Sequence, residues 1–248
     1  MDHTQALGVA DFLSQTDAIT KGAIFILLVM SVATWYLIIT KTIQILIARI
    51  RSKAFLAMFW NAPSIQAVGD ALGEKPPNEP FSHLTSQAIV SARHHAQHGA
   101  SRLTEAGTAA EFLTRAIRQA LDEETARVES GLTLLASVGS TAPFVGLFGT
   151  VWGVYHALIN IGMTGQGTLD KVAGPVGEAL IMTALGLAVA IPAVLAYNAV
   201  TRNNRLLLSR LDSFAHDLFA FLTTGVHVTE PNNIVPPKPM ATTSLGPN

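Results

Sequence analysis

Cysteine is absent from this chain of 248 residues, which excludes disulfides, thiol chemistry and zinc sites built on cysteine. Charge is also scarce: only 13% of the residues are Asp, Glu, Lys or Arg, about half the usual fraction in soluble domains. The net charge of −1 gives no reason to expect nucleic acid as a partner. By contrast, 49% of the residues are hydrophobic and the mean hydropathy is +0.38, so the composition predicts a membrane protein.

Motifs for catalysis, metal binding and nucleotide binding are missing as well. The sequence has no GxxxxGK[ST] phosphate loop, so ATP is not expected to supply energy. His94, His95 and His98 lack an accompanying carboxylate cluster, and we predict a solvated helix face there and no metal site. No nucleophile–base pair indicates an enzyme, and no cofactor is expected.

Three stretches are long and apolar enough to cross a bilayer, whose hydrocarbon core of about 30 Å requires roughly 20 apolar residues in a helix. We predict transmembrane helices at 22–40, 132–161 and 176–200. The preceding segment 1–21 lacks the basic start and cleavage site of a secretory signal, so the first span is expected to be retained.

Basic residues are distributed unevenly around these spans. Residues 41–131 contain ten of the sixteen Lys and Arg, and 201–248 contain four, whereas 1–21 and 162–175 contain one each. Cytoplasmic segments carry the excess of Lys and Arg in membrane proteins. We therefore predict that 41–131 and 201–248 are cytoplasmic, and that the N-terminus and the short loop 162–175 face outward.

The cytoplasmic region 41–131 is predicted to be helical with breaks. The helix of the first span continues to Trp60 in this interpretation. Residues 61–80 are rich in Pro and Gly, which predicts a loop with little regular structure. A second helix is expected at about 81–98. The C-terminal region 201–248 is predicted to be a helix followed by a disordered, Pro-rich tail.

A long apolar stripe follows the second cytoplasmic helix. Thr108 and Glu111 match a capping box, which is a plausible helix start, and no proline occurs between them and Pro143. We therefore expect one unbroken helix over about 109–160, which cannot bury its stripe without neighbouring helices. The stripe consists of Leu113, Ile117, Leu121, Val128, Leu132 and Leu135, with ion pairs Glu111–Arg115 and Glu123–Arg127 predicted at spacing i,i+4.

Small residues recur at helical spacing in the second and third spans. In the second span they are Gly139, Pro143, Gly146, Thr150, Gly153 and Ala157, and Gly149 adds a GxxxG with Gly153. In the third they are Ala179, Thr183, Gly186, Ala190 and Ala193. Small faces let helices approach closely in membranes. Packing between subunits and packing of the two spans within one chain are both compatible with this pattern.

Glu178 is the carboxylate at the start of the apolar third span. One interpretation places it in the first turn of a helix that begins near Pro175, where a carboxylate suits the helix dipole. The other places it on an ion or proton path, because ionisable residues inside membranes are usually functional. Thr150 and Thr183 are weaker candidates, since threonine often bonds to the backbone of its own helix.

Two stretches resemble a known family. "STAPFVGLFGTVWGVYHALINIG" (140–162) and "VAGPVGEALIMTALGLAVAIPAVLAYN" (172–198) are similar to the ExbB/TolQ/MotA family, and to its ExbB branch in particular. They cover about 50 residues, and the three-span outline with a large cytoplasmic region agrees over the remaining chain. MotA-type stators have four spans, which argues against that branch, whereas TolQ shares both motifs.

The resemblance implies an all-α protein of the bacterial inner membrane, with a periplasmic N-terminus. It implies a homopentamer around transmembrane helices of ExbD that works with TonB to use the proton-motive force for import through outer-membrane receptors of siderophores and vitamin B12. Thr150, Glu178 and Thr183 match the polar pore positions of the family. A TolQ-type subunit of the Tol-Pal system and a non-conducting membrane scaffold are the alternatives, and the sequence does not distinguish H⁺ from Na⁺.

Overall fold

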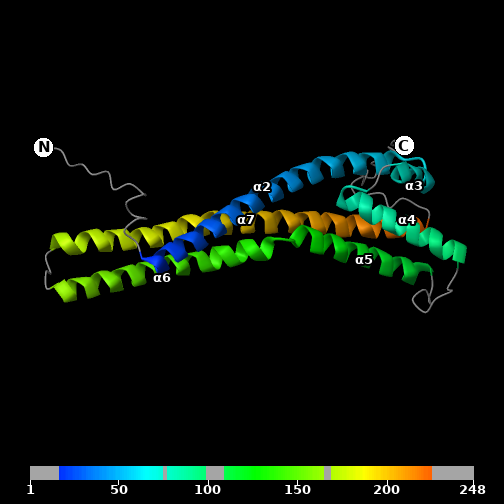
Figure 1. Cartoon of the computed structure of the whole chain (residues 1–248). Coiled ribbons are helices and arrows are strands. Elements are labelled where there is room, and N and C mark those ends of the chain that lie inside the picture. Colours follow the sequence, from blue (N-terminus) through cyan, green and yellow to red (C-terminus); the bar gives the residue numbers. More distant parts are fainter. Residues whose placement is uncertain (1–16, 75–76, 99–108, 165–168, 225–248) are drawn as a thin grey trace, which may run out of the picture.

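The computed structural model describes residues 17–74, 77–98, 109–164 and 169–224, and in these ranges it contains helices and no strand. The helices are α2 (Ala18–Asn61), α3 (Ile65–Glu74), α4 (Pro80–His98), α5 (Ala109–Glu129), α6 (Leu132–Thr164) and α7 (Leu169–Thr224). They form an elongated bundle, with α6 at one end, α3, α4 and α5 at the other, and α2 and α7 extending along both (Figure 1). The predicted all-α fold is confirmed.

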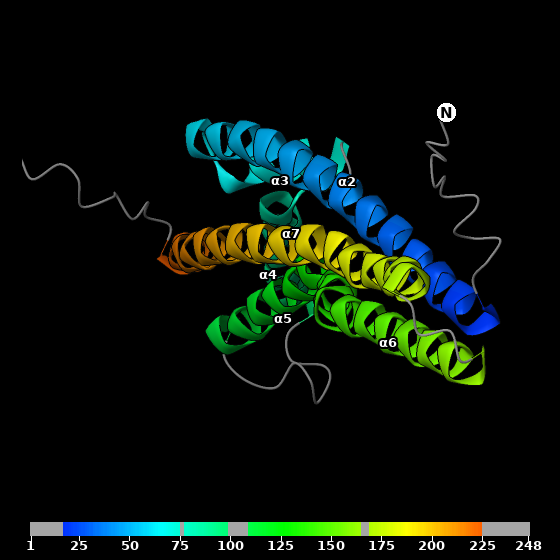
Figure 2. The same ribbon diagram turned by 90° about the vertical axis from the view of Figure 1, so that its left-hand side faces the viewer.

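Three helical stretches within the described residues are long and apolar enough to cross a membrane: α2, the α5–α6 stretch, and α7. The prediction of three apolar transmembrane helices is therefore confirmed. At about 1.5 Å per residue, the 44 residues of α2 and the 56 of α7 are much longer than a bilayer core. Both helices therefore run from the end of the molecule that contains α6 to the end that contains α3, α4 and α5. There α2 lies beside α4, and α7 lies beside α4 and α5 (Figure 2).

The prediction of a loop over 61–80 is wrong, because this segment contains α3. Ser64 Oγ accepts a hydrogen bond from the backbone N–H of Ala67 at 3.2 Å, which is the interaction of a helix N-cap. Val68 is buried in the core at the end formed by α3, α4 and α5, and Ile65 and Leu72 pack against the same core. Their apolar helical spacing outweighs the prolines and glycines on either side.

The prediction of one unbroken helix over 109–160 is also wrong. Helix α5 ends at Glu129 and α6 begins at Leu132, and Gly131 between them has a φ of 78°. Glycine adopts this left-handed conformation without steric penalty and commonly ends helices in this way. A prediction that treats proline alone as a helix breaker misses this glycine.

Two apolar cores stabilise the two ends of the molecule. The core at the end formed by α3, α4 and α5 is called the cytoplasmic core, after the location predicted for residues 41–131. It joins α2, α3, α4, α5 and α7 through large side chains, including Phe59, Phe81, Leu84, Leu211 and Phe214. The membrane core joins α2, α6 and α7 mainly through small residues and includes Ala23, Ala142, Met182, Ala190 and Ala193. Leu113 and Ile117 of the predicted stripe lie in the cytoplasmic core, so this part of the stripe finds its neighbours within the same chain.

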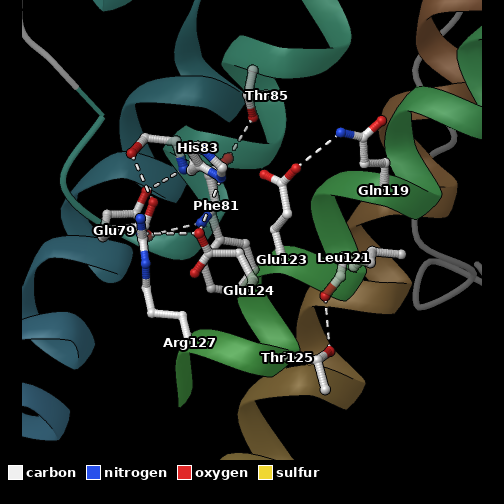
Figure 3. A network of polar contacts seen from close by, with 11 residues as sticks. Glu79, Phe81, His83, Thr85, Gln119, Leu121, Glu123, Glu124, Thr125 and Arg127 are labelled. Atoms are coloured by element: carbon white, nitrogen blue, oxygen red, sulfur yellow. Dashed lines mark hydrogen bonds and ion pairs between the residues drawn. The ribbon is translucent and has the colours of Figure 1, made fainter. Parts of the chain in front are cut away.

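A buried polar network, not predicted from the sequence, supports the cytoplasmic core (Figure 3). Glu79 is 5% exposed and caps α4 by accepting from the backbone N–H groups of Phe81 and Ser82. Ser52 Oγ of α2 donates to Glu79 Oε2 at 2.7 Å. The carboxylate of Glu79 therefore ties the start of α4 to α2.

A second buried carboxylate, Glu124, ties α5 to α4. Its Oε1 lies 3.0 Å from His83 Nδ1 and 3.0 Å from a guanidinium nitrogen of Arg127 (Figure 3). The predicted pair Glu123–Arg127 is therefore replaced by Glu124–Arg127 at spacing i,i+3, while Glu123 accepts a hydrogen bond from Gln119. Burial of Glu124 explains the exchange, because a carboxylate in a core needs a charged partner more than an exposed one does.

Candidate functional site

Helices α6 and α7 touch through their backbones at the centre of the membrane bundle. A Cβ atom added to Gly146 would lie 2.6 Å from the carbonyl oxygen of Met182 and 3.0 Å from Cα of Gly186. A Cβ added to Gly186 would lie 2.7 Å from the carbonyl oxygen of Ala142. No side chain fits between the helices at this crossing, and both positions require glycine for that reason.

The other small residues singled out in the sequence follow the same contact. Gly139 faces Val194, Gly149 faces the side chain of Met182, and Gly153 faces Ala179, whose Cβ would be 3.1 Å from an added Cβ. All of these neighbours belong to α7 of the same chain. Of the two open alternatives, the structure therefore shows packing of the second span against the third within one chain.

Thr150 and Thr183 meet across this contact. Their Oγ1 atoms are 2.6 Å apart, and Thr150 is buried. Thr150 Oγ1 also lies 3.1 Å from the carbonyl oxygens of Gly146, on its own helix, and of Ala179, on α7. The structure thus brings together two of the three predicted pore residues, which lie 33 positions apart in the sequence.

The arrangement assigns roles within this group. A hydroxyl carries one proton and can accept two hydrogen bonds, and the two carbonyl oxygens near Thr150 can only accept. When Thr150 donates to either carbonyl, Thr183 is left to donate to Thr150, which makes a short chain of hydroxyls. The oxygens of such a chain can solvate a positive charge. The direction of its hydrogen bonds reverses when both hydroxyls rotate.

Sequence reasoning missed the carbonyl of Ala179. Periodicity placed Ala179 and Thr183 on one small face but gave no sign that a backbone acceptor there would bind a side chain from α6. The signal that could have indicated this contact is a polar residue, Thr150, on the small face of one span, opposite the small face of the other.

Glu178 lies within α7, but its side chain is outside the described residues. Because α7 begins at Leu169, Glu178 is more than two helical turns from the helix start. The interpretation that placed it in the first turn of a helix beginning near Pro175 is therefore wrong. Its Cα is about 100° around the helix from Ala179, so it occupies a register position beside the face that contacts α6.

The fold and the crossing of α6 and α7 define the class of protein: an all-helical, multi-pass membrane protein with two long helices that extend beyond the bilayer. The profile of the MotA/TolQ/ExbB proton channel family matches residues 85–213. This chain belongs to that family, which is a family of transport proteins.

Individual relatives agree with the family match. The chain is 45% identical over 213 residues to the biopolymer transport protein ExbB of Xanthomonas campestris, covering 85% of this chain and 84% of that protein. It is 43% identical over 203 residues to ExbB of Neisseria meningitidis, covering 82% and 91%. It is 32% identical over 228 residues to the Tol-Pal system protein TolQ of Pseudomonas aeruginosa, covering 90% and 98%. These relatives support an inner-membrane, multi-pass protein.

Proposed function

We propose that this protein is an ExbB-type subunit that converts the proton-motive force into mechanical work for import through outer-membrane receptors. The observation that carries this proposal is the identity of 43–45% to two ExbB proteins over more than four fifths of the chain. The hydroxyl pair Thr150–Thr183, of which Thr150 is buried, supports it, because a channel needs polar groups inside an otherwise apolar bundle.

In this proposal, Thr150, Glu178 and Thr183 line the ion path. Glu178 is the titrating group in this chain, and the two hydroxyls solvate the charge during its passage. One elementary charge crossing 100 mV releases about 2.3 kcal/mol, so several protons are needed for a large mechanical step. The position of Glu178 beside the α6–α7 contact suits a path between several copies of the chain better than one inside a single copy.

The partners follow from the same proposal. The chain forms a homo-oligomer, a pentamer by family resemblance, around transmembrane helices of ExbD, and it works with TonB. The three membrane helices leave large apolar side chains exposed in the single chain, including Phe25 of α2, Phe144 of α6 and Leu195 of α7. Lipid and further copies of the chain would cover these faces. The N-terminus is periplasmic and the C-terminus cytoplasmic in this arrangement.

The test replaces Glu178 in cells and measures proton-gradient-dependent uptake of a siderophore or of vitamin B12 at matched protein levels. We expect Glu178→Ala and Glu178→Gln to abolish uptake while the complex remains assembled, because neither side chain can ionise. Glu178→Asp should keep part of the activity, since the carboxylate survives with a shorter reach. Wild-type uptake with Gln would refute the titrating role, because Gln preserves volume and most hydrogen bonds.

A TolQ-type role is the second candidate, favoured by the match to TolQ over 98% of that protein's length. Expression of this chain in bacteria that lack ExbB, and separately in bacteria that lack TolQ, distinguishes the two. Restored siderophore uptake without restored envelope integrity supports the ExbB role. Replacing the proton gradient with a sodium gradient in the same cells identifies the ion.

A further inference from the structure

Three helices meet at one carbonyl group where α5 ends. The carbonyl oxygen of Val128 accepts a hydrogen bond from Lys41 Nζ of α2 at 3.2 Å and one from Asn204 Nδ2 of α7 at 2.8 Å. Lys41 Nζ also donates to Ser130 Oγ at 3.1 Å. Lys41 and Asn204 are 6% and 5% exposed, so both donors are held in the interior at this point.

This junction differs from an ordinary helix end. The last carbonyls of a helix have no partner in their own helix, and here the donors that satisfy one of them come from two other helices. Ser130 and Gly131, the two residues that follow α5, leave the helical conformation, and Gly131 has a φ of 78°. The chain can therefore change direction at Gly131 without breaking a regular helix.

The C-terminus of α5 stabilises the buried ammonium group of Lys41. Both of its hydrogen-bond acceptors are neutral oxygens, and a buried cation is costly without compensation. The negative end of the α5 dipole supplies part of that compensation, because cations are stabilised at helix C-termini. Lys41 therefore stabilises α5 in one position relative to α2, and loses that stabilisation when α5 moves.

The junction also lies between the two cores of the molecule. A small apolar cluster of Leu132, Leu135 and Val200 begins directly after Gly131 in the sequence and is separate from both the cytoplasmic core and the membrane core. A hollow of about 460 Å³ borders it, lined by Glu129, Leu132 and six residues of α7 that include Asn204 and Arg205. In the single chain, α5 consequently has space on one side of its C-terminus.

We propose that Ser130–Gly131 is a hinge between the membrane and cytoplasmic bundles, and that Lys41 and Asn204 form a latch that holds it closed. When the latch is closed, a displacement of α6 or α7 in the membrane moves α5 with it. When the latch is open, α6 moves while α5 stays in place. The consequence for transport rests on the proposed function, whereas the latch itself does not.

Hydrogen exchange of the full-length protein in lipid nanodiscs tests the latch directly. Lys41→Met removes the donor and keeps the aliphatic chain, and Lys53→Met is the matched control on the exposed side of the same helix. We expect backbone amides of 124–129 to exchange about tenfold faster in Lys41→Met, because hydrogen bonds to charged groups are stronger than those between neutral groups. Amides of 113–120, further from the junction, and the Lys53→Met protein should exchange as in wild type.

Asn204→Ala is the second variant, in case Lys41→Met does not insert or fold. It should also accelerate exchange at 124–129, and the effect of the double variant should differ from the product of the two single effects, because both donors bind the same oxygen. Wild-type exchange in both single variants would overturn the latch. Multiplicative effects would overturn the shared site.

Uptake measurements test the consequence for transport. We expect Lys41→Met to lower gradient-dependent uptake at least about tenfold at matched levels of assembled complex, and Lys53→Met to leave it unchanged. Faster exchange together with wild-type uptake would overturn the transmitting role of the hinge. Failure of the proposed function shows separately, as no restored uptake by the wild-type chain in bacteria that lack ExbB, and leaves the exchange result intact.

Discussion

The cytoplasmic and membrane bundles share two helices, α2 and α7, but are packed by opposite means. In the cytoplasmic bundle, Phe214 lies among rings, with centroid distances of 5.0 Å to Phe59 and 5.4 Å to Phe81. In the membrane bundle, α7 presents Gly186 and α6 presents Gly146, and their Cα atoms come close enough to exclude any side chain. One helix therefore changes from small to large buried residues along its length.

The solvent explains this difference. In water, burial of apolar surface drives folding, so large side chains give the most stabilisation per residue. Lipid tails are as apolar as leucine, so that driving force is missing, and close backbone contact with many van der Waals interactions replaces it. The position where the packing of α7 changes, near Val200, also marks the membrane boundary predicted from the sequence.

The largest loss of stability is expected for Phe214→Ala in the cytoplasmic bundle. Phe214 is 4% exposed, and truncation of a buried phenylalanine costs about 3–5 kcal/mol. We expect thermal unfolding of this bundle, followed by proteolysis in nanodiscs, at a markedly lower temperature. Leu206→Ala, at an exposed position of the same helix, is the control and should change the unfolding free energy by no more than about 0.5 kcal/mol. Equal effects of the two variants would contradict the assignment of the core.

The glycines of α6 give a graded test of the membrane bundle. Gly146→Ala places a methyl group 2.6 Å from a backbone oxygen, and Gly153→Ala places one 3.1 Å from the Cβ of Ala179. Gly162→Ala meets nothing within 4 Å in the single chain. Overpacking costs about 1–3 kcal/mol, so we expect the loss of stability to fall in the order Gly146, Gly153, Gly162.

Measurement of unfolding in lipid, with the three variants side by side, checks this order. The Gly162 variant should be as stable as wild type or slightly more so, because alanine is favoured over glycine inside helices by about 1 kcal/mol. If Gly146→Ala were instead harmless and Gly162→Ala disruptive, the glycines would act between subunits and not between α6 and α7.

The comparison also shows which features of the fold the sequence could predict. The three spans were visible because each apolar run reaches the length of about 20 residues that a helix needs to cross a bilayer. The small faces of the second and third spans could be predicted because their small residues recur at helical spacing. The same spacing lets the two helices pack closely. Whether they pack within or between chains depends on tertiary contact, such as Gly146 against Met182, which spacing alone does not encode.

The features that the sequence did not reveal depend on single residues or on contacts between helices. Helix α3 depends on a serine cap and on Val68 finding a place in the core, and the break before α6 depends on one positive φ at Gly131. The polar contacts of Lys41 and of Glu124 join residues from different helices. At the site, the threonines were predicted, but the carbonyl of Ala179 that accepts from Thr150 was not, because a backbone acceptor has no sequence signature.

Apart from the control variants and Gly162→Ala, the smallest expected effect on stability belongs to the hydroxyl pair, and it sharpens the comparison most. Thr150→Val keeps the shape of the side chain but removes its bonds to Thr183 and to Ala179. Side-chain hydrogen bonds between membrane helices contribute about 0.6 kcal/mol on average and rarely more than about 1.7. We therefore expect the unfolding free energy of Thr150→Val in nanodiscs to fall by about 1 kcal/mol or less.

Uptake should respond differently, because a hydroxyl that solvates a moving charge has no substitute among apolar side chains. Thr150→Val should lower gradient-dependent uptake strongly, and Thr150→Ser, which restores the hydroxyl without the methyl group, should recover most of it. The same pair of variants at Thr183 provides the comparison across the contact. If Val and Ser at position 150 supported equal uptake while stability fell as expected, the hydroxyl pair would be a packing feature of the membrane bundle, and the ion path would have to run elsewhere.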